Sequence, residues 1–154
     1  MKRDSKLSSV LHVLLHLAHS ERPMTSEQMA GMLGTNPVLV RRVLAGLRER
    51  GYISSERGHG GGWSIRCDLA TVTLRDVYDA VGAPTVFAMG NRNEHSACLV
   101  EQVVNASLAD AFQDAEALLV KRLGEVTLAD LSRDFNRSYD HHPHRRPQDE
   151  HPAN

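Results

Sequence analysis

The stretch "NPVLVRRVLAGLRERGYISSERGHGGGWSIR", residues 36–66, decides the fold. It opens with Asn36, a good N-cap, and with Pro37 at the first helical position, where a missing N–H is tolerated. Four aliphatic residues then recur at helical spacing and predict one buried stripe: Val40, Val43, Leu44 and Leu47. Gly51 ends this helix, and two β-like runs around a glycine-rich turn follow it. The stretch therefore predicts a helix that leads directly into a β-hairpin.

A second helix is predicted just upstream, over residues 25–33. Thr25 or Ser26 serves as its N-cap, and Gly34 ends it. Two helices joined by a short turn with glycine form the helix-turn-helix pattern, and the following hairpin makes it the winged variety. Further upstream, apolar residues at helical spacing predict a mostly buried first helix from Leu7 to Ala18.

Downstream, Thr73 and Asp76 have capping-box spacing and predict a helix over "TLRDVYDAVG". A long helix is predicted from Cys98 to about Leu123. Its apolar stripe recurs close to coiled-coil spacing: Leu99, Val103, Ala106, Ala109 or Asp110, Phe112, Ala115 or Glu116, Leu119 and Leu123. A second copy of the chain is the simplest partner for this stripe, and packing against its own domain is the alternative.

The fold class predicted is mostly α with a small β-hairpin wing, in a chain of 154 residues. A winged helix-turn-helix domain over residues 1–82 is followed by a loop over 83–97. The long dimerisation helix and a short terminal helix at "TLADL" then occupy residues 98–131. Residues 132–154 have few apolar side chains, three prolines and many charges, which predicts a disordered tail.

Charge is unevenly distributed along the chain. Residues 1–66 hold 10 Lys and Arg against 5 Asp and Glu, a net charge of +5, whereas residues 67–154 hold 8 against 14, a net charge of −6. A basic first half favours contact with a polyanion. No apolar run is long enough for a membrane span, and histidines interrupt the apolar N-terminal segment, which excludes a signal peptide.

The chain has two cysteines, Cys67 and Cys98, at a spacing that fits neither a disulfide framework nor a zinc site. We therefore expect a reducing, cytoplasmic location and no membrane partner. The glycine-rich loop at 58–62 has three interpretations: a phosphate-binding loop, a DNA-binding wing or a loose hairpin. A phosphate-binding loop needs a helix after it and a Lys at its end, but "GGGWSIR" continues as a strand and lacks that Lys.

The motifs "NPVLVRRVLAGLRERGYI", "SSERGHGGGWSI", "TLRDVYDAV" and "CLVEQVV … TLADL", in this order over residues 1–131, resemble those of the Rrf-two family of bacterial transcription regulators. The resemblance implies a winged helix-turn-helix domain, a long dimerisation helix and homodimers that bind double-stranded operator DNA, usually as repressors. Family members that hold an iron–sulfur cluster carry three cysteines before the long helix. Here only Cys98 stands there, so we expect the cluster-free branch and no cofactor.

The candidate DNA-binding residues lie on the second helix of the motif, at its N-terminus and in the wing: Thr35, Asn36, Arg41, Arg42, Arg48, Arg57, His59 and Gly60. Arg41 and Arg42 fall in the half of the helix that enters the major groove, where arginine bonds guanine or phosphate. Asn36 can face phosphate or simply cap its helix. The resemblance implies that Arg57 enters the minor groove. His59 can touch phosphate, although an exposed turn residue is the interpretation we favour.

Cys98 is a candidate redox sensor, because a helix N-terminus favours the thiolate form, and an inert, partly buried residue is the alternative we favour. The histidines of "HHPHRR" could bind a metal weakly, and two or three of His12, His16 and His19, which share one helical face, could meet a metal. We favour solvated side chains in both places, so no metal site is predicted. The loop 83–97 leaves room for an unidentified small effector, since the family's sensor lies there.

The sequence thus predicts a sequence-specific, homodimeric repressor and no catalytic residue. A thiol-based redox-sensing repressor that uses Cys98 is the alternative. A small ligand-binding module or enzyme built on the glycine-rich loop is a distant third, because no Ser–His–Asp or paired-carboxylate arrangement is apparent.

Overall fold

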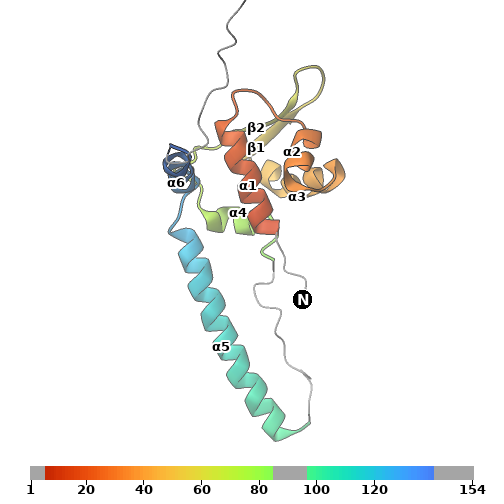
Figure 1. Cartoon of the computed structure of the whole chain (residues 1–154). Helices are drawn as coiled ribbons and strands as arrows, with labels where there is room; N and C mark the ends of the chain where they lie inside the picture. The colour runs from red at the N-terminus through yellow and green to blue at the C-terminus, as the bar shows by residue number, and fades with distance from the viewer. Residues whose placement is uncertain (1–5, 85–96, 141–154) are drawn as a thin grey trace, which may run out of the picture.

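The computed structural model describes residues 6–84 and 97–140. Within them the chain forms six helices and one β-hairpin (Figure 1). The elements are α1 (Lys6–His19), α2 (Ser26–Leu33), α3 (Pro37–Glu49), β1 (Ile53–Glu56), β2 (Gly62–Ile65), α4 (Leu74–Ala80), α5 (Leu99–Gly124) and α6 (Leu128–Asp140). The mostly helical fold with a winged helix-turn-helix, predicted from the sequence, is confirmed.

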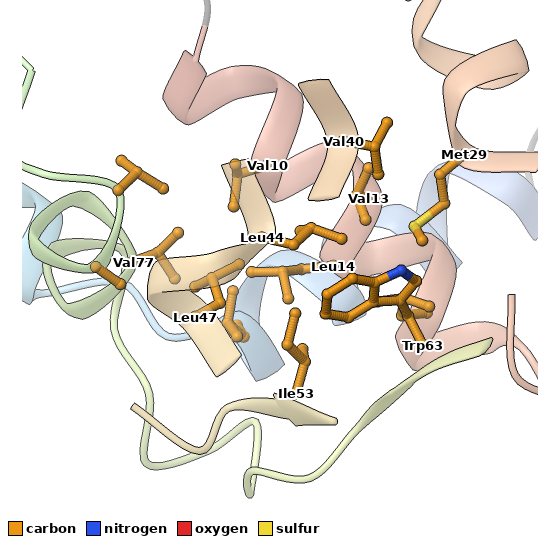
Figure 2. Packing of buried hydrophobic residues seen from close by; sticks show 14 of the residues in the cluster. Val10, Val13, Leu14, Met29, Val40, Leu44, Leu47, Ile53, Trp63 and Val77 are labelled. Atoms are coloured by element: carbon orange, nitrogen blue, oxygen red, sulfur yellow. The ribbon is translucent and has the colours of Figure 1, made fainter. Parts of the chain in front are cut away.

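One aliphatic core joins α1, α3 and the hairpin. Leu14 of α1, Leu44 and Leu47 of α3 and Ile53 of β1 are at most 2% exposed, and Figure 2 shows their side chains converging beside Trp63. Full burial of one such side chain stabilises the fold by about 1.5–3 kcal/mol. The stripe read from residues 40–47 is therefore the face that fixes α3 to the body.

The wing is attached to the body by a third extended segment. β1 and β2 pair antiparallel with Ile53 opposite Ile65, and Met24, just before α2, pairs with Trp63 through N–H···O bonds of 3.0 and 2.8 Å. Trp63 also donates its indole N–H to the buried Ser26 hydroxyl at 2.9 Å. Gly62, at φ 152°, makes this pairing possible, because a Cβ there would lie 2.7 Å from the Met24 carbonyl oxygen.

A close approach of two helices fixes the far end of α3. A Cβ on Gly46 would overlap the carbonyl oxygen of Ala80, at the end of α4. Glycine is normally unfavourable inside a helix by about 1 kcal/mol. Here it lets the backbones of α3 and α4 come into contact, a requirement that the helical pattern of the sequence does not reveal.

Two capping boxes, one at the start of α4 and one at the start of α6, lie side by side. Thr73 and Asp76 form the predicted box at the start of α4, and Thr127 and Asp130 form the same arrangement at the start of α6. An antiparallel bridge joins Thr73 to Thr127, with Leu74 N–H donating to the Val126 carbonyl at 2.9 Å. This pairing attaches the segment between α5 and α6 to the start of α4, and so to the winged domain.

The disordered tail expected from Ser132 onward is wrong for residues 132–140, because α6 continues to Asp140. The helix is held there by a contact with α1: the His19 ring lies 4.9 Å from the Phe135 ring, and its Nε2 lies 3.0 Å from Asn136 Oδ1. Such long-range contacts offset the low apolar content on which the expectation rested. The remainder of the tail, 141–154, lies outside the described residues.

The long helix α5 leads away from the body, with its C-terminal end near α4 and α6 (Figure 1). None of its residues is buried. In the C-terminal half of the predicted stripe, Phe112, Ala115, Leu119 and Leu123 are half-buried, and this end of α5 contacts α4, so packing against the chain's own domain covers only that half. The N-terminal half of α5 exposes Leu99, Val100, Val103 and Val104, each at least half accessible.

Candidate nucleic-acid interface

The turn between α2 and α3 is held by local hydrogen bonds. Thr25 and Gln28 form a capping box at the start of α2, and Gly34 ends that helix at φ 61°, as predicted. The Asn36 side chain accepts a bond of 3.0 Å from the Leu39 N–H. Asn36 therefore acts as the cap of α3, and its exposed neighbour Thr35 stands beside the N-terminus of that helix. The start of α3 is fixed rigidly to α2 as a result.

The face of α3 opposite the core is open to solvent. Arg41, Arg42 and Arg48 are all exposed on it. Residues 35–66 contain six arginines and two glutamates, a net charge of +4. This concentration of guanidinium groups over one helix and the adjoining hairpin matches the electrostatic needs of a phosphate backbone.

Two apolar residues in the first turn of α3 are also exposed, and the sequence interpretation missed both. Val38 is 68% exposed and Leu39 43% exposed, although both are large aliphatic residues. The available signal was their position outside the stripe formed by residues 40–47. Aliphatic side chains at the start of a groove-reading helix can contact the methyl group of thymine.

Arg41 already has a partner in this structure. Its Nη2 lies 2.9 Å from Glu27 Oε1 on α2, with the two side chains 54% and 62% exposed. An ion pair so exposed contributes little to stability. It does fix the direction of the guanidinium group, and it places a carboxylate next to the arginine that was expected to meet DNA. No pattern in the sequence indicated this pairing.

The wing presents Arg57, His59 and Gly60, all exposed, at the turn between β1 and β2. Gly58 and Gly60 adopt φ values of 98° and 77° in this turn. On the neighbouring strand surface, Arg66 donates to the Ser54 hydroxyl at 2.9 Å and lies 3.4 Å from Glu56. Arg66 is thus held across the hairpin, whereas Arg57 stands at its tip.

The two cysteines lie in different settings. Cys67, just after β2, packs against the core, and its burial raises the pKa of its thiol. Cys98 is the N-cap of α5 and is exposed, so the expectation that it would be partly buried is wrong. Most of the loop between α4 and α5, residues 85–96, lies outside the described residues, and so does the "HHPHRR" segment.

His12, His16 and His19 are exposed on α1, as expected. In residues 6–84 and 97–140 no group of three or more His, Cys, Asp or Glu is arranged to hold a metal ion. Among the described helices none combines the length and apolar character that crossing a bilayer requires.

Comparison with known proteins agrees with this geometry. The family model Rrf2, described as an iron-dependent transcriptional regulator, matches residues 3–134. A Bacillus subtilis protein named as an HTH-type transcriptional regulator, YwnA, is 27% identical over 128 residues, which cover 83% of this chain and 95% of that protein.

Solved structures show the same fold. A structure titled as that of a transcriptional regulator from Lactobacillus plantarum superimposes with a TM-score of 0.71 at 28% identity, over 87% of this chain and 91% of the other. CymR, the global cysteine regulator of Bacillus subtilis, has a TM-score of 0.60 at 21% identity, over 86% of this chain and 97% of its own. At that identity, CymR supports the fold alone.

Proposed function

The chain belongs to the Rrf2 family of transcriptional regulators, and on that premise we propose that it is a homodimeric repressor that binds operator DNA through α3 and the wing. One observation carries the proposal: Arg41, Arg42 and Arg57 are exposed on a helix and a hairpin whose other faces are fixed in the core. In a winged helix-turn-helix, these two elements are the ones that meet the duplex.

The proposed contacts divide by type. Arg41 and Arg42, with the exposed Val38, face the major groove, where arginine bonds guanine and an aliphatic side chain meets a thymine methyl group. Thr35 and the backbone N–H groups at the start of α3 face phosphate. Arg48, His59 and Gly60 are assigned to backbone contacts, which position the protein without reading sequence. Arg57 is assigned to the minor groove.

The second copy is proposed to cover α5. Leu99, Val100, Val103, Val104, Leu108 and Leu118 are between 41% and 74% exposed along this helix. A contiguous apolar surface of this kind marks a protein interface. A twofold pairing of α5 with itself would bury the surface and present two recognition helices to a palindromic operator.

The residues present do not fit an iron–sulfur cluster. Such clusters are ordinarily held by several cysteine thiolates, and this chain has two cysteines in all. Cys67 packs against the core after β2, and Cys98 begins α5 on the surface. We therefore propose that operator binding in this protein does not depend on a cluster.

A redox-sensing repressor is the second candidate, and the exposure of Cys98 at the N-cap of α5 favours it. Oxidation of a thiol at the start of the proposed dimerisation helix would add bulk where this helix follows the loop 83–97. In this version oxidant releases the wild-type protein from DNA, whereas Cys98→Ser stays bound in the presence of oxidant.

The test of the proposal is a gel shift on the DNA upstream of the protein's own gene, with and without a thiol oxidant. Wild type is expected to bind, and Arg41→Ala and Arg57→Ala are expected to lose binding while keeping wild-type melting curves. Arg75→Ala, which removes an exposed arginine of α4, outside α3 and the wing, serves as the matched control. A turnover activity that survives Arg41→Ala would instead favour an enzyme, and folded arginine variants that bind as wild type would refute the assigned interface.

A further inference from the structure

The exposed face of α1 brings two imidazole rings together. His12 and His16 stand four residues apart, so successive turns of the helix place them on the same face. Their Nε2 atoms lie 2.9 Å apart and their ring centroids 4.8 Å apart. The proximity follows from the helix itself, since any α-helix aligns residues at this spacing.

These two rings differ from the third histidine of the helix. His19 Nδ1 lies 2.7 Å from the Leu15 carbonyl oxygen and its Nε2 contacts Asn136, so His19 is engaged in holding α6. Within residues 6–84 and 97–140, the ring nitrogens of His12 and His16 have hydrogen-bond contact only with each other. Neither ring is therefore required for the packing of α1.

The protonation of His16 also suits coordination. Burial lowers the pKa of His16, and the neighbouring His12 and His19 lower it further. The neutral imidazole, which binds metals, is accordingly the favoured form of His16 near pH 7.

We propose that His12 and His16 form a two-histidine chelate for a divalent transition metal of the Cu²⁺ or Ni²⁺ class. Two nitrogens bound at about 2.05 Å and at right angles are about 2.9 Å apart, whereas a tetrahedral centre would separate them by roughly 3.3 Å. The two Nε2 atoms, 2.9 Å apart in a hydrogen bond between the rings, are close enough for one ion to replace the shared proton and occupy a position between them, as adjacent sites of a square-planar or octahedral centre require. Water completes the coordination, because no group of three potential ligands occurs in residues 6–84 and 97–140.

The experiment uses the full chain in a background where the histidines of the C-terminal segment are replaced: His141→Gln, His142→Gln, His144→Gln and His151→Gln. This background removes competing imidazoles while leaving α1 intact. Cu²⁺ and Ni²⁺ are titrated by calorimetry, and Cu²⁺ is also followed by electron paramagnetic resonance. One ion per chain, a spectrum with two coordinated nitrogens and a raised Tm are expected.

His12→Gln and His16→Gln, each added to that background, are expected to weaken affinity by at least about tenfold, the loss that even an outer contact to a metal site can cause. His59→Gln, which removes an exposed histidine from the wing, is the matched control and should leave affinity unchanged. Melting curves without metal verify that each variant is folded. The proposal is overturned if the background binds no ion, or if folded His12→Gln and His16→Gln bind it as tightly as His59→Gln.

Discussion

At the scale of single residues, we expect the Arg41–Glu27 pair to affect DNA binding more than stability. Glu27→Gln leaves the guanidinium without its carboxylate, 2.9 Å away in the wild type, and removes a negative charge from the proposed interface. We expect the free energy of unfolding to change by less than about 1 kcal/mol, as for other exposed pairs. Affinity for a non-operator duplex should rise, because one repulsive charge is lost.

Urea unfolding and fluorescence anisotropy with operator and non-operator duplexes measure the two effects. Glu49→Gln, an exposed change at the C-terminal end of α3, is the matched control for the loss of one negative charge. A non-operator affinity of Glu27→Gln no higher than that of Glu49→Gln would show that the Glu27 carboxylate beside Arg41 does not limit DNA binding.

Gly46 and Gly31 form a second comparison between single residues. Both lie in helices, but a Cβ on Gly46 overlaps the Ala80 carbonyl oxygen, whereas a Cβ on Gly31 has nothing within 4 Å. Gly46→Ala should destabilise the protein by about 2 kcal/mol or more, as overpacked sites do. Gly31→Ala should stabilise it by up to about 1 kcal/mol through helix propensity. Urea unfolding measures both, and changes of the same sign would contradict the packing of α3 on α4.

At the scale of elements, the sequence was most informative where the determinant is local. The caps at Thr25, Asn36 and Thr73 and the stripe from Val40 to Leu47 follow from neighbours within one turn, and the structure confirms them. The spacing of Leu131, Phe135 and Tyr139 was a local sign that α6 continues to Asp140. The contact of that segment with His19, more than a hundred residues away, could not be inferred from any local pattern. The same reason explains why the Arg41–Glu27 pair and the need for Gly46 were missed.

The candidate interface shows the same division. The exposure of its arginines could be predicted, because they lie off the apolar stripe of α3. The exposure of Val38 was missed, although it too lies off that stripe, because an aliphatic residue is normally assigned to the core. The DNA-binding roles of all these residues remain predictions.

The paired capping boxes give the protein an acid-sensitive element. Hydrogen bonds from the Thr73 hydroxyl and N–H hold the pKa of Asp76 below its ordinary value of 3.8. Because the pKa is lower in the folded state, the stabilisation is complete above the unfolded value and is lost as pH falls through the folded one. Thr73→Val should cost about 0.5–2 kcal/mol at pH 7.

Urea unfolding at about pH 7 and about pH 3 measures this contribution. Thr73→Val should lose less stability between the two pH values than wild type does. Thr71→Val provides the control, because the Thr71 hydroxyl donates to a backbone carbonyl, that of Asp68, rather than to a carboxylate. Equal pH dependence in wild type and Thr73→Val would exclude the Asp76 box as the source.

At the scale of the whole molecule, the exposed apolar surface of α5 can be buried only against a partner. A charged residue at its centre should prevent association, because an unpaired buried charge is costly. Leu108→Glu is expected to sediment as a monomer and to bind operator DNA far more weakly. Gln113→Glu adds the same charge at an exposed polar position of α5 and should remain a dimer. Analytical ultracentrifugation distinguishes these outcomes, and a dimeric, folded Leu108→Glu would place the interface elsewhere.

The salt dependence of operator affinity tests the central claim, DNA binding by α3 and the wing, most directly. Each phosphate contact releases condensed counterions, so the logarithm of affinity should fall linearly with the logarithm of salt concentration. We predict a steep negative slope for wild type and a slope shallower by about one in Arg48→Ala, which removes one proposed phosphate contact. An affinity that does not change with salt, or folded Arg41→Ala and Arg57→Ala variants that bind as wild type does, would contradict the proposed interface.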